Sequence, residues 1–157
     1  MIEIMAKDGA TKADVTQPEV VGQSPKRDEH YILDLCDELL RQKARRQYTG
    51  FDFLVGDAGT RLPVDAYYPS LWLVLEYHER QHKTSPPYHG RKVTVSGTRG
   101  EQRWKYDQLR RDLFPKHGIK LVEILYSEFA CRRGKRLQRN VDVDIEILRR
   151  RLWEWIR

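Results

Sequence analysis

Apolar positions cluster most densely between Leu62 and His82, and their spacing predicts two strands joined by a tight turn. Residues 62–68 form the first predicted strand and residues 71–79 the second. Pro69-Ser70 provide the turn, because proline presets φ and serine tolerates turn geometry. The second strand begins with five apolar residues, Leu71-Trp72-Leu73-Val74-Leu75, and is therefore predicted to be central and buried.

Charged residues end this apolar strand abruptly, at Glu76 and His78. A register centred on the turn places Asp65 opposite Val74. Side-chain alternation then puts Glu76 and His78 on the face of Val74. Asp65 and Glu76 become diagonal neighbours, about 7–8 Å apart at the backbone. Two carboxylates this close repel each other unless a cation lies between them. The pattern therefore predicts a site for Mg²⁺, which takes oxygen ligands and is usually held by one or two carboxylates.

The remaining periodicity predicts three helices and two further strands. Helices are expected at residues 28–46 with Asp28 as N-cap, at residues 100–114 before Pro115, and at residues 144–157; strands are expected at residues 51–55 and 119–129. Residues 56–59 form a turn into the strand of Asp65, and Gly118 follows the second helix as a C-cap type residue. A strand after a crossover helix should lie parallel to an earlier strand.

Apolar stripes predict which side chains of these elements are buried. The predicted packed residues are Trp104, Leu109 and Leu113 in the second helix, Leu121, Val122, Ile124 and Leu125 in the last strand, and Ile145, Leu148, Leu152 and Trp155, widened by Trp153 and Ile156, in the last helix. Residues 1–26 lack periodicity and are interpreted as a mobile arm. Residues 27–157 are interpreted as a single domain.

Asp65 and the triplet Glu76-Tyr77-His78 resemble the core motif of the PD-(D/E)xK nuclease superfamily. Pro63-Val64-Asp65 stands where that superfamily has Pro-Asp, and the triplet stands where it has Asp or Glu, any residue, and Lys. The resemblance implies an α/β fold with a mixed sheet, the restriction-endonuclease-like αβββαβ core, here with an extra C-terminal helix. The order of elements read from periodicity is the same.

His78 departs from the superfamily, because it replaces the lysine. A histidine here, followed by His82, is more similar to the very-short-patch repair endonuclease branch. In that branch a basic loop leads into a helix with Asp-x-x-Arg, then Leu and Gly; the corresponding residues here are Asp107, Arg110, Leu113 and Gly118. The similarity spans about residues 28–129. A first-helix acid sometimes completes the site in this superfamily; Glu38 is the candidate, but the pattern favours an ordinary solvated helix residue there.

The resemblance implies a metal-dependent endonuclease that hydrolyses phosphodiester bonds of double-stranded DNA, of a restriction type or of a repair type that nicks one strand. Asp65 and Glu76 would hold Mg²⁺, for which Mn²⁺ can substitute, and the backbone carbonyl of Tyr77 would add an oxygen ligand. His78 would orient or deprotonate the attacking water, since an unperturbed histidine has a pKa of about 6.5. His82 would assist or protonate the leaving oxygen.

Composition favours a polyanionic partner. The 157 residues include 29 Lys and Arg against 23 Asp and Glu, a formal net charge of +6, which suits nucleic acid. Basic residues gather in the loop at residues 80–100, along the following helix and at residues 131–140. The residues expected to contact DNA phosphates are Arg91, Lys92, Arg99, Arg103, Lys105, Arg110, Arg132, Arg133, Lys135 and Arg136.

Other features argue against several classes of protein. The two cysteines, Cys36 and Cys131, form neither a disulfide framework nor a Cys-x-x-Cys zinc site. The apolar runs are far shorter than the roughly 20 residues that a membrane helix needs. The first ten residues contain acids and no long apolar core, unlike a signal peptide. We therefore expect a cytoplasmic protein without membrane contacts.

Several alternatives stay open at the level of sequence. Loss of the lysine is compatible with a degenerate nuclease that binds DNA without cutting it. A zinc-binding module could use His78, His82, His89 and Cys131, although their spacing is irregular. Structured RNA or branched DNA could replace duplex DNA as the substrate. Concerted cutting of both strands would require two active sites, and hence a homodimer.

Overall fold

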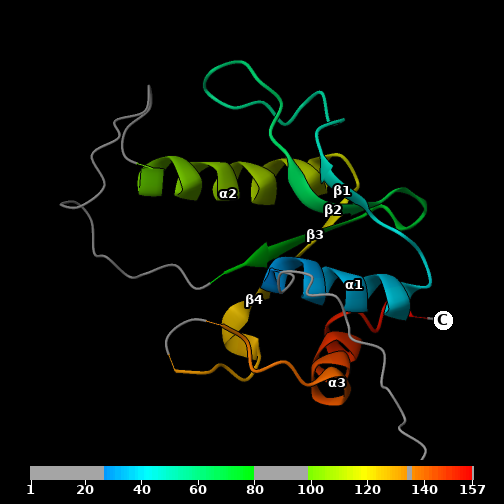
Figure 1. The fold of residues 1–157 in the computed structure, drawn as a ribbon. Coiled ribbons are helices and arrows are strands. Elements are labelled where there is room, and N and C mark those ends of the chain that lie inside the picture. The colour runs from blue at the N-terminus through cyan, green and yellow to red at the C-terminus, as the bar shows by residue number, and fades with distance from the viewer. Residues whose placement is uncertain (1–26, 80–98, 134–135, 157) are drawn as a thin grey trace, which may run out of the picture.

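The computed structural model describes residues 27–79, 99–133 and 136–156. These residues form a mixed α/β structure with a four-stranded mixed sheet and three α-helices (Figure 1). In chain order the elements are α1 (Asp28–Leu40), β1 (Arg45–Tyr48), β2 (Val64–Tyr68), β3 (Leu73–His78), α2 (Arg99–Lys116), β4 (Lys120–Leu125) and α3 (Val141–Arg151). Single 3-10 turns at Pro69–Leu71 and Tyr126–Glu128 follow β2 and β4.

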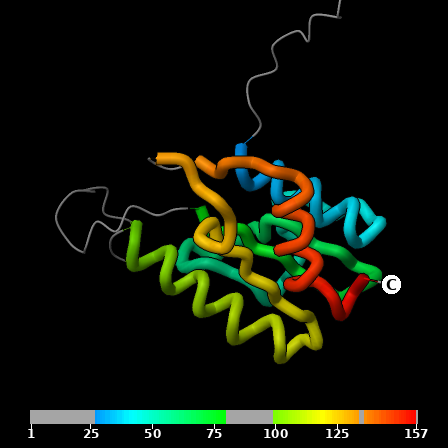
Figure 2. Tube along the Cα trace, turned by 90° about the horizontal axis from the view of Figure 1, so that it is seen from below, coloured from blue at the N-terminus to red at the C-terminus, as the bar shows by residue number. Residues whose placement is uncertain are grey.

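The sheet lies between two helical layers. Figure 1 shows α2 on one face of the sheet and α1 with α3 on the other, and Figure 2 shows α1 and α3 next to each other. Two apolar clusters match these faces. Leu73, Leu75 and Ile124 belong to the cluster under α1 and α3, whereas Val74 packs in the cluster that includes Phe114 of α2.

The sheet order is β1-β2-β3-β4. The first three strands pair antiparallel, and β4 pairs parallel to β3 after the crossover through α2. The prediction of a parallel last strand is therefore confirmed, and helices and strands follow one another in the predicted order. Gly118 has a left-handed φ of 70° just after α2, as predicted for a C-cap type glycine.

The predicted register between β2 and β3 is wrong by two residues. Val74 lies opposite Tyr67 rather than Asp65, and the last backbone pair before the strands part is Ala66 with Leu75. The cause is the connection, since Pro69–Leu71 forms a 3-10 turn and Trp72 follows in a left-handed conformation with φ 50°. Because the shift is an even number of residues, every side chain stays on its predicted face.

The first helix and first strand also differ from the prediction. α1 ends at Leu40, where Arg41 adopts a left-handed cap, and β1 occupies Arg45–Tyr48, whose first two residues were predicted to end the helix. The Asp37 carboxylate accepts a hydrogen bond from the Ala44 N–H, which holds the chain as it turns away from α1. The segment at residues 51–55 is not a strand, although its Phe51 and Leu54 are buried. Asp28 is not the N-cap, which is Arg27.

Later elements need smaller corrections. α2 does not stop before Pro115 but includes it, which is tolerated because a proline this near the end disrupts little of the remaining helix. α3 begins at Val141, where the Asn140 side chain accepts a hydrogen bond from the Val143 N–H and caps the helix. β4 ends at Leu125, earlier than predicted.

Four side chains predicted to be buried are exposed. They are Trp72, Trp104, Leu125 and Trp153. Leu109 and Leu113 of α2 pack as predicted, together with Phe114, and Trp104 lies outside that stripe. Leu148 and Leu152 are fully buried as predicted, but α3 ends at Arg151 rather than at residue 157. Within the described ranges, no helix combines the length and apolarity needed to span a membrane.

Candidate functional site

Asp65 and Glu76 come together where β2 and β3 part. Beyond the pair Ala66–Leu75, side chains replace the backbone ladder between the strands. The Asp65 N–H donates to Glu76 Oε1 at 3.3 Å, and the Tyr77 N–H donates to Asp65 Oδ2 at 2.8 Å. Each carboxylate thus accepts a bond from the opposite strand, and the two acids are direct neighbours, closer than the predicted diagonal arrangement.

Glu76 lies in an environment that disfavours its charge. It is only 8% exposed. Burial and the neighbouring Asp65 carboxylate raise the pKa of Glu76 to about 8, and Arg110 opposes this only in part. Any further cation that comes close to this carboxyl therefore favours its ionised form.

Arg110 of α2 reaches into the site. Its Nε lies 3.4 Å from Glu76 Oε1, and its Nη2 donates to the Pro63 carbonyl at 2.8 Å. A third contact joins Nη1 to Asp107 at 3.4 Å, the Asp-x-x-Arg pair seen in the sequence. Arg110 was predicted to contact DNA phosphates, but its side chain points inward to Glu76 and Pro63.

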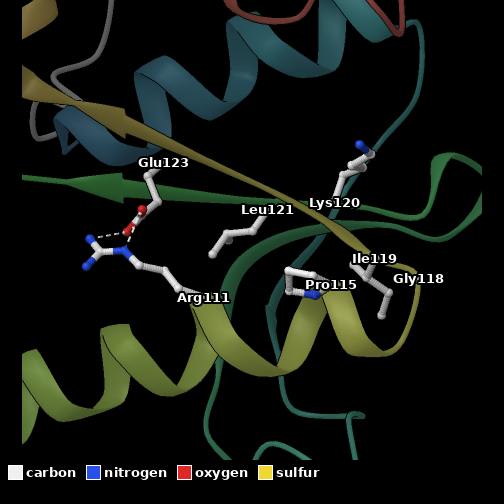
Figure 3. Close-up of a pocket in the computed structure, with 7 residues that line it drawn as sticks. All are labelled: Arg111, Pro115, Gly118, Ile119, Lys120, Leu121 and Glu123. Carbon is white, nitrogen blue, oxygen red and sulfur yellow. Dashed lines mark hydrogen bonds and ion pairs between the residues drawn. The ribbon is translucent and has the colours of Figure 1, made fainter.

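His78 lies beside an acid that the sequence analysis did not assign. Its Nε2 is 3.0 Å from Oε1 of Glu123 on β4. Arg111 of α2 holds the same carboxylate through two hydrogen bonds of 2.8 Å (Figure 3). Burial raises the pKa of Glu123, but Arg111 and His78 lower it by more, so its pKa lies below the ordinary range. Glu123 is therefore a charged partner that orients the imidazole.

A cleft of about 390 Å³ opens beside this ion pair, between the second half of α2 and β4 (Figure 3). Arg111 and Glu123 form one end of its lining, and Pro115, Ile119 and Leu121 provide apolar walls. Asp65 and Glu76 do not line it. The cleft therefore adjoins the candidate site only through Glu123.

A second acid, Glu29, approaches Asp65 from the first turn of α1. The Gln47 side-chain amide lies between them, with Nε2 at 3.2 Å from Glu29 Oε1 and 3.3 Å from Asp65 Oδ1. Burial and Asp65 raise the pKa of Glu29, while His30 and the Gln47 bond act in the opposite direction. The first-helix acid near the site is thus Glu29 rather than Glu38, which lies about two and a half turns further along α1 and lines a different groove.

Several other predicted residues can now be placed. Arg99, Arg103, Arg132, Arg133 and Arg136 are exposed, as phosphate contacts require. Lys105 is exposed and forms an ion pair with Asp57. His82, His89, Arg91, Lys92 and Lys135 lie outside the described residues, as do the 1–26 arm and most of the basic loop.

Three of the residues gathered here were missed by sequence reasoning. Glu123 carried a usable signal, because it interrupts an apolar strand just as Glu76 does. Glu29 lies in the first turn of a helix, where acids are common for helix-dipole reasons alone. Gln47 carried no signal, because the chain was predicted to be leaving a helix at that point.

The donor set suits Mg²⁺ but is small. Among the residues that the structure describes, no group of three or more His, Cys, Asp or Glu side chains is arranged to hold a metal ion. Mg²⁺ needs only one or two protein carboxylates, since it usually keeps several waters. The two neighbouring carboxylates of Asp65 and Glu76 meet that requirement. The alternative of a zinc-binding module is not supported by the position of Cys131, whose Sγ donates to the backbone carbonyls of Tyr126 and Phe129.

Comparison with known proteins identifies no relative of this chain. No protein-family model matches the chain, and no curated protein or solved structure matches it.

Proposed function

We propose that this chain is a Mg²⁺-dependent endonuclease of the PD-(D/E)xK type that hydrolyses phosphodiester bonds of double-stranded DNA. The observation that carries the proposal is the pair Asp65 and Glu76, held together where β2 and β3 part, with His78 two residues further along β3. The element order αβββαβ, followed by a last helix, agrees with a restriction-endonuclease-like fold.

Asp65 and Glu76 would hold the metal ion, together with the carbonyl of Tyr77, and Mn²⁺ would substitute for Mg²⁺. When bound, the ion would polarise the phosphoryl oxygen and lower the pKa of an attacking water. The Tyr77 N–H fixes one oxygen of Asp65 and leaves lone pairs of both oxygens for ligation.

His78 would act as the general base. Its Nε2 faces Glu123, so the ring presents Nδ1 for the proton of the attacking water. The negative Glu123 stabilises the imidazolium that results, and Arg111 keeps Glu123 in place. His82 would assist, or protonate the leaving oxygen.

Exposed arginines of α2 and of the segment after β4 would hold the DNA backbone. Such contacts give register and affinity rather than base recognition, and they weaken as salt rises. Cutting both strands would employ a homodimer, and nicking would employ one chain.

One observation favours a second candidate, a DNA-binding protein of the same fold that does not cut. Arg110 provides Glu76 with a permanent positive neighbour at 3.4 Å, in a site that lacks the lysine of the superfamily. A guanidinium in this place could substitute for the metal ion structurally without supplying its chemistry.

Supercoiled plasmid distinguishes the candidates. The purified chain is incubated with Mg²⁺, Mn²⁺ or EDTA, beside Asp65→Ala, His78→Ala and the control Glu38→Ala. The nuclease yields linear or open-circular DNA, and this cleavage disappears with EDTA, with Asp65→Ala and with His78→Ala but not with Glu38→Ala. Intact plasmid that shifts in a low-salt gel supports the binding protein. Plasmid that is neither cut nor shifted overturns both.

A further inference from the structure

Gln47 has an unusual backbone conformation for its position. Among the described residues, three that are not glycine have a positive φ: Arg41, Gln47 and Trp72. Arg41 ends α1 and Trp72 ends the 3-10 turn, and left-handed residues are common at such ends. Gln47, with φ 46°, lies inside a strand. A left-handed conformation is unfavourable for a side-chain-bearing residue, and such strain tends to occur at functional sites.

The pairing of β1 with β2 shows what this conformation does. Arg46 pairs with Ala66 and Tyr48 pairs with Val64, whereas Gln47, whose partner in this register is Asp65, makes no regular pair. A residue that leaves the ladder in this way can aim its side chain in a new direction. The Gln47 side chain lies against Asp65 itself.

The amide of Gln47 then bonds two acids at once. Its NH₂ group has two hydrogens, and Nε2 lies 3.2 Å from Glu29 Oε1 and 3.3 Å from Asp65 Oδ1. Because the Tyr77 N–H holds Asp65 Oδ2, both oxygens of Asp65 are fixed by donors. The amide is neutral, so it holds the two acids side by side without cancelling their charge.

We infer that Gln47 is a positioning residue of the acidic site, whose strained backbone serves to orient Asp65 and to hold Glu29 beside it. The inference rests on the proposed function, because the site it prepares is the proposed metal site. Groups that orient metal ligands typically contribute about 10- to 100-fold to metal affinity or activity.

Two substitutions of Gln47 separate the contribution of its side-chain amide from that of its strained backbone. Gln47→Met removes the amide and keeps the length and the left-handed conformation, whereas Gln47→Gly removes the amide and relieves the strain. Arg41→Gly is the matched control, because it relieves the same strain at a helix end away from the site. Each full-length chain is tested by plasmid cleavage with Mg²⁺, by calorimetric titration with Mn²⁺, and by thermal melting.

We expect both Gln47 variants to cleave about 10- to 100-fold more slowly and to bind Mn²⁺ more weakly by a similar factor. Gln47→Gly should nevertheless melt above Gln47→Met. Arg41→Gly should keep wild-type cleavage and Mn²⁺ binding. A purely structural residue would behave differently, since activity would then follow stability and the glycine variant would regain it.

The inference is overturned if Gln47→Met or Gln47→Gly cleaves and binds Mn²⁺ like the wild type while Asp65→Ala does neither. It is also overturned if both Gln47 variants are unfolded, because Gln47 would then serve the fold. A wild-type chain that neither binds Mn²⁺ nor cuts, like Asp65→Ala, refutes the proposed function itself, and the role of Gln47 with it.

Discussion

Asp144 and Glu76 are the two buried charged residues of the described chain, and they lie on opposite sides of the sheet. Asp144 accepts hydrogen bonds from the Tyr31 hydroxyl at 2.7 Å and from the Asn140 N–H at 3.0 Å, and so joins α3 to α1. Glu76 has a longer bond of 3.3 Å from the Asp65 N–H and an acid as its neighbour. Asp144 thus has two short hydrogen bonds, whereas Glu76 has one long bond and the Arg110 guanidinium at 3.4 Å.

The comparison shows that burial of an acid does not by itself indicate function. Asp144, Asp37 and Asp28 each accept bonds that connect α1 to other elements. Where β2 and β3 part, by contrast, Asp65 and Glu76 are direct neighbours, and Glu29 of α1 approaches Asp65 across the Gln47 amide. Buried polar groups are normally satisfied, so three neighbouring acids near the single guanidinium of Arg110 form a place where a further cation would be accommodated.

Substitutions of Glu76 and Asp144 should differ most in their effect on DNA cleavage. Glu76→Gln removes a proposed metal ligand, and we expect cleavage of plasmid to fall by about a thousandfold, since metal ions supply several kcal/mol to the transition state. Asp144→Asn should cleave at the wild-type rate wherever circular dichroism shows it folded. Equal losses in both variants would remove the distinction between the two acids.

The pH dependence of stability should also distinguish Glu76 from Asp144. In the folded protein Glu76 keeps its proton up to about pH 8, and its ordinary value is 4.5. Between these values the folded state binds the extra proton, so stability falls as pH rises through this window, by at most about 1.4 kcal/mol per pH unit. Outside this pH range, the titration of Glu76 does not change the stability of the protein with pH.

Urea unfolding at several pH values without metal tests this expectation. The decline between about pH 5 and pH 8 should flatten in Glu76→Gln and persist in Asp144→Asn. Added Mg²⁺ should stabilise the wild type most at the upper end of the window, where Glu76 ionises. A wild-type profile that is already flat would contradict the raised pKa of Glu76.

Glu123 offers an intermediate case, because it has strong donors yet lies in the proposed site. Glu123→Gln removes the charge that faces His78, and we expect kcat to fall by about 100-fold with little change in KM, since general-base catalysis is worth about 10²–10⁴. Glu123→Asp should recover part of the loss. The control Glu146→Gln, on the exposed side of α3, should behave as wild type. An unaltered kcat in Glu123→Gln would make this ion pair structural.

The smallest effect concerns stability alone. Tyr31→Phe deprives buried Asp144 of a 2.7 Å hydrogen bond, which should lower the free energy of unfolding by about 2 kcal/mol. Cleavage by the folded protein should be unchanged. Tyr126→Phe is the control, since the hydroxyl of Tyr126 makes no hydrogen bond among the described residues. Denaturant titration of both variants decides the matter.

Much of the architecture could be predicted because local signals agreed with tertiary ones. The apolar strand β3, the helix α2 and the parallel β4 all came from periodicity and from the need for a crossover. The errors lie where a distant contact overrode local preference. Helical spacing continued past Leu40, but the chain turns there and Asp37 fixes Ala44 and the Tyr68 hydroxyl. Trp104 fits an apolar stripe in sequence yet lies outside the face that meets the sheet.

For the candidate site, the sequence alone determined that Asp65, Glu76 and His78 share one face of two adjacent strands. Strand alternation has a period of two, so even a register error of two residues left this unchanged. Only the tertiary structure decided which other groups meet them. Glu29, Gln47, Arg110 and Glu123 come from four other elements, and no local pattern encodes contacts made through the packing of a helix on a sheet or the pairing of distant strands.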